Sequence, residues 1–175
     1  IAFSSLQTAR VLDFLYAAAA KRRRHGVSFD GGVPTLSLWA PTAKSVALRL
    51  YANGDVATYE EHPMERQSDG SWTIEGDASW ADRSYVYDVE VYIPQTSVTK
   101  EDASQQSLAD TVAHNLVTDP NSVGLTTDSK RSVVLDLDDP RYQPESWRAN
   151  PAPAISNQAE RSILEMHVRD FSATD

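Results

Sequence analysis

This sequence of 175 residues contains no cysteine, which excludes a disulfide-stapled scaffold, a zinc site with cysteine ligands and a cysteine nucleophile. It also lacks an apolar run long enough to span a bilayer, so no integral membrane protein is predicted. Basic side chains number only 16 against 25 acidic ones, and the resulting net charge of −9 opposes binding to a polyanion. We therefore expect neither nucleic acid nor membrane among the partners.

The absence of cysteine suits an exported protein as well as a cytosolic one, so the compartment stays open, with an extracellular location favoured over a cytoplasmic one. The chain begins at Ile1, without a methionine or a secretion signal, and we expect it to be a piece of a longer protein. Its hydrophobic content of 41% is sufficient for one core.

The N-terminal segment, residues 1–30, has helical character. Ser4 and Gln7 have the spacing of a capping box, and the basic run 21–24 would lie at the negative end of the helix dipole. Apolar side chains recur at helical spacing between them: Leu12, Leu15, Tyr16 and Ala19. The pattern predicts a helix within residues 4–24.

Residues 31–138 change to the two-residue period of β-strands. Leu36 and Leu38 share one face of a short strand, and the pair Asn53-Gly54 is typical of a tight hairpin turn. The clearest strand covers residues 84–93, where apolar and aromatic side chains alternate with acidic ones. Several short strands separated by turn residues predict a mainly β fold, an immunoglobulin-like antiparallel β-sandwich.

Three further segments differ in composition. Residues 94–113 are polar and without period, which indicates an exposed insertion within a hairpin. Residues 139–160 hold four prolines and are predicted to form an extended linker. Residues 161–175 start another apolar strand, Ile163 to Phe171.

The residues that could carry chemistry do not form a recognisable set. Asp136, Asp138 and Asp139 lack the glycine and the later glutamate of a calcium loop. No feature brings two particular carboxylates into a cleft, as glycoside hydrolysis requires, and no nucleophile–histidine pair can be assigned. We therefore predict no catalytic residue, no metal site and no cofactor in this chain.

Aromatic side chains remain as candidates, because flat rings stack on the apolar faces of sugars. Trp39 and Trp72 lie in strand patterns, which favours core packing for both. Trp80 stands among polar residues in a loop-like context, and Tyr92 faces away from the apolar stripe of its strand. Trp80 and Tyr92 are therefore the predicted carbohydrate-binding residues.

Four ordered motifs resemble the debranching members of the alpha-amylase superfamily, of the pullulanase or limit dextrinase type. The first resembles the sandwich module that precedes the catalytic barrel, and the last resembles the first strand of that barrel. The likeness runs from about Val11 to the end of the chain. The four motifs cover residues 38–46, 85–92, 117–132 and 163–172.

The resemblance implies a retaining enzyme that cuts alpha-1,6 branch linkages in pullulan, amylopectin or limit dextrins. Its catalytic aspartate, glutamate and second aspartate come from later barrel strands, beyond Asp175, so this piece alone is expected to be noncatalytic. The implied partners are an alpha-glucan and the chain's own barrel, which is also where any calcium would lie. The family usually has an irregular loop after a match to residues 11–16, whereas propensity predicts a helix there, and both readings stay open.

Three hypotheses of function follow. The first is the accessory β-sandwich of a pullulanase-type enzyme. The alternative is an independent alpha-glucan-binding module, for which Trp80 and Tyr92 are the expected contacts. The third is a protein interaction module, because an isolated barrel strand over residues 163–171 would expose an apolar edge and allow self-association.

Overall fold

The fold was analysed in a computed structural model, which describes residues 9–52, 57–92, 112–167 and 170–171. The chain divides into two compact units, residues 1–136 and 137–175. The predicted capping box, the Asn53-Gly54 turn and nearly all of the 94–113 insertion lie outside the described residues. Within the part of the chain that is described, no helix is long and apolar enough to cross a membrane.

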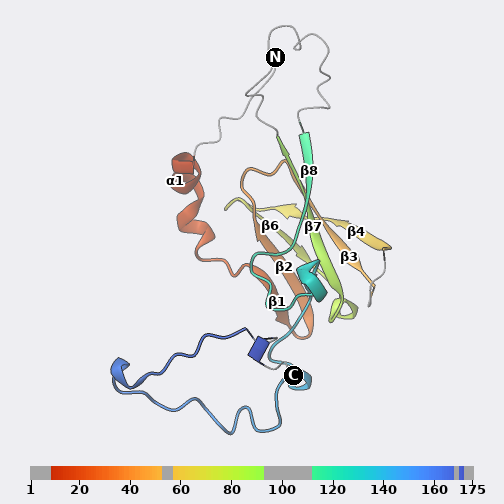
Figure 1. The fold of residues 1–175 in the computed structure, drawn as a ribbon. Coiled ribbons are helices and arrows are strands. Elements are labelled where there is room, and N and C mark those ends of the chain that lie inside the picture. Colours follow the sequence, from red (N-terminus) through yellow and green to blue (C-terminus); the bar gives the residue numbers. More distant parts are fainter. Residues whose placement is uncertain (1–8, 53–56, 93–111, 168–169, 172–175) are drawn as a thin grey trace, which may run out of the picture. The chain divides into compact units, whose positions relative to one another are not determined.

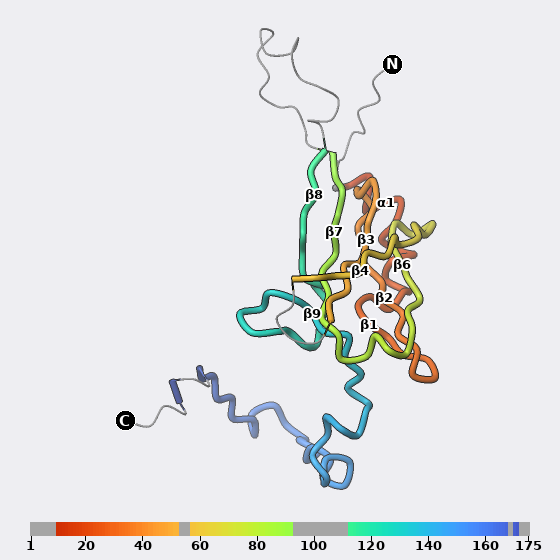
Figure 2. Tube along the Cα trace, turned by 90° about the vertical axis from the view of Figure 1, so that its right-hand side faces the viewer, coloured from red at the N-terminus to blue at the C-terminus, as the bar shows by residue number. Residues whose placement is uncertain are grey.

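The first unit contains two antiparallel sheets, so the predicted β-sandwich class is confirmed (Figure 1). One sheet has the order β1-β2-β6-β5, and the other has the order β4-β3-β7-β8, with β9 also paired to β7. Figure 2 shows β7 and β8 running side by side. The strands are β1 (Gly26–Asp30), β2 (Val33–Trp39), β3 (Ser45–Tyr51), β4 (Tyr59–Pro63), β5 (Glu65–Arg66), β6 (Ser71–Glu75), β7 (Ser84–Tyr92), β8 (Val112–Val117) and β9 (Ser132–Val133).

The core lies between the two sheets because the central strands β2, β3 and β7 each have one apolar face. Leu36 and Leu38 of β2 and Leu48 and Leu50 of β3 are all buried, as the alternation predicts. Burying a side chain of this size contributes about 1.5–3 kcal/mol before the entropy of ordering is subtracted. The buried cluster comprises Leu36, Leu38, Ala43, Val46, Leu48, Leu50, Met64, Trp72, Trp80, Tyr85, Tyr87, Val89 and Val134.

A helix, α1 (Ala9–Ala20), precedes the sheets, so the local propensity prevails over the irregular loop that the resemblance favoured. Its last residue, Ala20, is buried, and His25 Nε2 lies 3.1 Å from the Ala20 carbonyl oxygen. Arg23 joins the segment after the helix to the sandwich, with Nε 2.7 Å from Asp69 Oδ2. The sandwich begins with β1 at Gly26, which has a φ of +84°, rather than at residue 31.

The described part of the second unit, residues 137–167 and 170–171, includes the short 3₁₀ turns η4 (Pro140–Tyr142) and η5 (Gln158–Glu160). The expected strand Ile163–Phe171 is not formed: the described residues of that range, 163–167 and 170–171, include no strand. A strand needs neighbours to pair with, and the Ile163 side chain is 92% exposed. Four prolines remove backbone donors from the preceding stretch, which keeps it extended.

Candidate functional site

Trp80, one of the two predicted sugar-binding residues, is a core residue. It ends η1 (Ala78–Trp80), a 3₁₀ turn capped by Asp77, whose Oδ1 accepts a hydrogen bond of 2.8 Å from Ser79 N. The indole is 7% exposed and its centroid lies 4.8 Å from that of the His62 ring. It also covers Gly76, where a Cβ would come within 2.4 Å of Trp80 Cε3. The polar neighbours suggested a loop in solvent, but they cap a turn that directs the ring inward.

Tyr92, the other predicted residue, is the last residue of β7 and is 45% exposed. Its neighbour on the same face is Glu90, which pairs with Lys44 at 2.7 Å between Oε1 and Nζ. The hydrogen bond to Glu90 raises the pKa of Lys44 despite some desolvation, with smaller contributions from the charges of Glu90 and Tyr92. Tyr92 is therefore a solvent-exposed residue beside the Lys44–Glu90 ion pair.

A row of paired charges crosses the same face from β4 to β8. Arg49 Nε lies 3.2 Å from Glu61 Oε2, and the Arg49 guanidinium also contacts Asp88. His114 Nδ1 lies 3.0 Å from the other oxygen of Asp88. The antiparallel register places Arg49 opposite Glu61, so the row follows directly from the sequence. These side chains give the surface a set of hydrogen-bonding groups that lie side by side.

Tyr85, Tyr87 and Asp119 form a buried polar cluster, which sequence analysis did not identify. The Tyr85 and Tyr87 hydroxyls donate to Asp119 Oδ2 at 2.7 and 3.1 Å, and Asn121 N donates to Oδ1 at 2.8 Å. Burial, together with the Asp119 charge, raises the pKa of both phenols, so they remain hydroxyl donors. A catalytic acid or base must reach a substrate, whereas this cluster holds the segment after β8 on the sheet.

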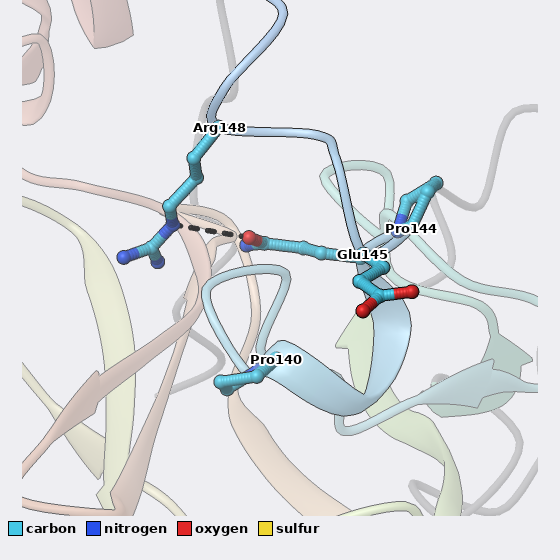
Figure 3. Close-up of a pocket in the computed structure, with 5 residues that line it drawn as sticks. Pro140, Pro144, Glu145 and Arg148 are labelled. Atoms are coloured by element: carbon cyan, nitrogen blue, oxygen red, sulfur yellow. Dashed lines mark hydrogen bonds between the residues drawn. The ribbon is translucent and has the colours of Figure 1, made fainter.

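A hollow of about 230 Å³ lies in the second unit (Figure 3). Its main internal contact is a hydrogen bond of 3.1 Å from Arg148 Nε to Gln143 Oε1. Ligand pockets usually measure about 300–1,000 Å³, so this hollow is small for a sugar chain. It is lined by Pro140, Gln143, Pro144, Glu145 and Arg148.

Trp39, which the alternation placed in the core, is instead 36% exposed at the end of β2. The signal was present in the sequence, because Leu36 and Leu38 occupy the buried face and Trp39 therefore points to the other side. Among the described residues, no group of three His, Asp or Glu side chains could hold a metal ion.

Comparison with known proteins identifies related sequences along nearly the whole chain. The family model of carbohydrate-binding module 48 (isoamylase N-terminal domain) matches residues 24–122. "Pullulanase 1, chloroplastic" of Arabidopsis thaliana is 34% identical over 178 residues, which cover 98% of this chain and 16% of that protein. Pullulanase of Klebsiella pneumoniae is 35% identical over 181 residues, covering 100% of this chain and 15% of that protein. The chain thus spans about one sixth of the length of these relatives.

Solved structures agree with the sequence comparison. Ligand-free PulA from Klebsiella pneumoniae has a TM-score of 0.66 and 36% identity, covering 82% of this chain and 12% of that one. Pullulanase from Bacillus acidopullulyticus has a TM-score of 0.63 over 85% of this chain and 16% of that one, at 23% identity. The second likeness bears on the fold alone.

Proposed function

The chain belongs to the carbohydrate-binding module 48 (isoamylase N-terminal domain) family, and from this membership we propose that it is the noncatalytic accessory β-sandwich of a pullulanase-type enzyme. The parent enzyme is proposed to hydrolyse alpha-1,6-glucosidic branch linkages in pullulan, amylopectin or limit dextrins. The observation that carries this proposal is the match of 98–100% of the chain to 15–16% of two pullulanases.

The proposal divides the work between two parts of one protein. The sandwich supplies a folded body and a sugar-contacting surface, while the bond-breaking carboxylates, and any calcium, belong to the barrel of the parent. The relatives supply the support for this division, because most of their length lies outside the match. The extracellular location that the sequence favours stays a prediction.

Enzyme assays test the division of work. Incubated with pullulan, the isolated chain is expected to release no reducing sugar, whereas the longer parent polypeptide is expected to release oligosaccharides from it. Sugar release by the isolated chain would contradict the noncatalytic assignment. A parent polypeptide that cuts an unbranched alpha-1,4-glucan but releases nothing from pullulan, amylopectin or limit dextrins would contradict the proposed linkage specificity.

The glucan contact is proposed for the face that carries Tyr92. A related pullulanase of Klebsiella pneumoniae has been crystallised with maltotriose, which makes an alpha-glucan the appropriate class of probe. Affinity electrophoresis in amylopectin gels should retard the chain, and Tyr92→Ala should reduce the retardation. Tyr142→Ala removes a tyrosine of similar exposure from the second unit and serves as the matched control. Unaltered mobility of the unsubstituted chain would remove the binding role.

A second candidate function, protein interaction, is favoured by the exposed apolar side chains near the C-terminus. Ile163, Leu164, Met166 and Phe171 are all at least half exposed. Such a surface can drive self-association when no partner covers it. Light scattering over a range of concentrations tests this candidate, and a monomer at every concentration would contradict it.

A further inference from the structure

Trp39 is the exposed tryptophan of the first unit, on the sheet opposite to the one that carries Tyr92. The other two tryptophans of this unit, Trp72 and Trp80, are buried in the core. Trp39 ends β2 and pairs with Ser71 of β6, whereas Tyr92 ends β7 in the second sheet (Figure 1). Trp39 is 36% exposed, so part of this large aromatic residue is accessible to a ligand.

Hydrogen bonds fix the orientation of the Trp39 indole. Its Nε1 donates to the Asp69 carbonyl oxygen at 3.1 Å, which restricts rotation of the ring. The next residue, Ala40, is also held, because its carbonyl oxygen accepts a bond of 3.0 Å from Trp72 Nε1. A ring that is already held in place loses little conformational entropy when a ligand stacks on it.

The turn that receives the Trp39 bond is itself rigid. Asp69 is buried, and its Oδ1 accepts a bond of 3.0 Å from Ser71 N. Gly70 has a φ of +78°, and a Cβ there would lie 2.8 Å from Pro41 Cβ and 3.3 Å from Tyr16 Cγ. The turn is therefore packed between α1 and the segment that follows Trp39.

Two arginines lie around this turn and supply planar hydrogen-bonding groups. Arg23, which is bonded to Asp69, has a side chain 37% exposed, and its charge is balanced by that carboxylate. Arg66 is exposed and its Nη2 donates to the Pro41 carbonyl oxygen at 3.1 Å. A sugar ring needs this combination, because its C–H face stacks on an aromatic ring while its hydroxyls bond to polar groups at the ring edge.

We propose that Trp39, flanked by Arg23 and Arg66, forms a second alpha-glucan contact on sheet β1-β2-β6-β5, separate from the face with Tyr92. The inference rests on the proposed glucan-binding function. The two contacts lie on different sheets, so a branched polymer could engage both at once, whereas a short oligosaccharide would occupy them independently.

Affinity electrophoresis in amylopectin distinguishes this inference from the function on which it rests. Trp39→Ala should weaken the apparent affinity about tenfold, because a lost stacking contact removes roughly that factor. Trp147→Ala, which removes an exposed tryptophan of the second unit, is the matched control and should leave the affinity unchanged. Retardation of Trp39→Ala equal to that of the unsubstituted chain overturns the second contact alone. Failure of the unsubstituted chain to be retarded overturns glucan binding as a whole.

A fluorescence measurement covers the case in which Trp39→Ala does not fold. In the variant Trp147→Phe, Trp39 is the exposed indole, because Trp72 and Trp80 are buried. Maltotriose should then reduce quenching of the tryptophan fluorescence by acrylamide. Quenching that is the same with and without maltotriose, at maltotriose concentrations that abolish retardation in the amylopectin gel by competition, overturns the proposal.

Discussion

The sandwich and the second unit contain the same kinds of apolar side chain and use them differently. Leu36 and Leu48 are fully buried between two sheets, whereas Leu137 and Leu164 are more than half exposed. Hydrophobic composition is thus not what separates the regions. The difference is that the central strands of the sandwich pack against an opposing sheet, whereas the described residues of the second unit form no second layer to pack against.

The largest expected effect comes from replacing a leucine by alanine in the sandwich and comparing it with the same substitution in the second unit. Leu48→Ala should lower the free energy of unfolding by about 2–5 kcal/mol, because it empties a fully buried site. Leu164→Ala in the second unit should change it by less than about 0.5 kcal/mol. Urea unfolding followed by circular dichroism measures both, and similar losses would show that the second unit shares the core.

Two aspartate substitutions, one in each unit, test the same contrast between buried and exposed side chains. Asp119→Ala should cost about 3 kcal/mol, because it leaves the Tyr85 and Tyr87 hydroxyls buried without their acceptor. Asp139→Ala removes a carboxylate that also accepts a hydrogen bond from a backbone N–H, that of Arg141. This pair lies at the surface, where water replaces the lost acceptor, so a clearly smaller loss of stability is expected. Equal destabilisation in the same unfolding experiment would argue that burial does not set the cost.

Two glycines sharpen the comparison within the sandwich. Gly31 and Gly70 both have positive φ, so alanine at either position is strained by about 1 kcal/mol or more. At Gly31 an added Cβ meets nothing within 4 Å, whereas at Gly70 it meets Pro41. Gly70→Ala should therefore be the more destabilising by a further 1–3 kcal/mol, roughly. Thermal melts that rank the two variants alike would place Gly70 outside the packed region.

The smallest expected effect is a pH dependence. Burial tends to raise the pKa of Asp69, but the hydrogen bonds from Arg23 and Ser71 outweigh it and lower that pKa to about 2. A lowered carboxyl pKa stabilises the fold above the unfolded value near 4, and this stabilisation is lost as the pH falls from about 4 to 2. Asp69→Asn should flatten the acid limb of stability against pH, and Asp139→Asn should flatten it less, because the hydrogen bonds from Arg141 that lower the pKa of Asp139 lie at the surface. An unchanged acid limb in Asp69→Asn would mean that the Arg23 pair contributes nothing measurable.

The fold was predictable because the sequence pattern and the packing agree. Alternation placed Leu36, Leu38, Leu48 and Leu50 on buried faces, and four motifs identified the debranching-enzyme resemblance, which the relatives confirm. The prediction of a helix within residues 4–24 was also confirmed, because a high helix propensity from several alanines determines the conformation of a segment at the surface.

The candidate site was less predictable because exposure depends on contacts distant in sequence. The polar neighbours of Trp80 predict a loop residue, yet Trp80 packs against Gly76 and His62, and His62 is eighteen positions away in the sequence. Trp39 was predicted to lie in the core, although the two-residue period of a strand places its side chain on the face opposite to that of the buried Leu38. The Asp119 cluster depends on a register between segments more than thirty residues apart, which no local pattern contains.

The Tyr85–Tyr87–Asp119 cluster has a consequence at the alkaline end of the pH scale. Phenols whose pKa is raised by folding stabilise the folded state below about pH 10, the pKa of free tyrosine, and this stabilisation is lost progressively as the pH rises from there toward the higher pKa of the folded state. The two rings should therefore gain ultraviolet phenolate absorbance only when the sandwich opens. Spectrophotometric titration in base would thus report the pH at which the two sheets separate.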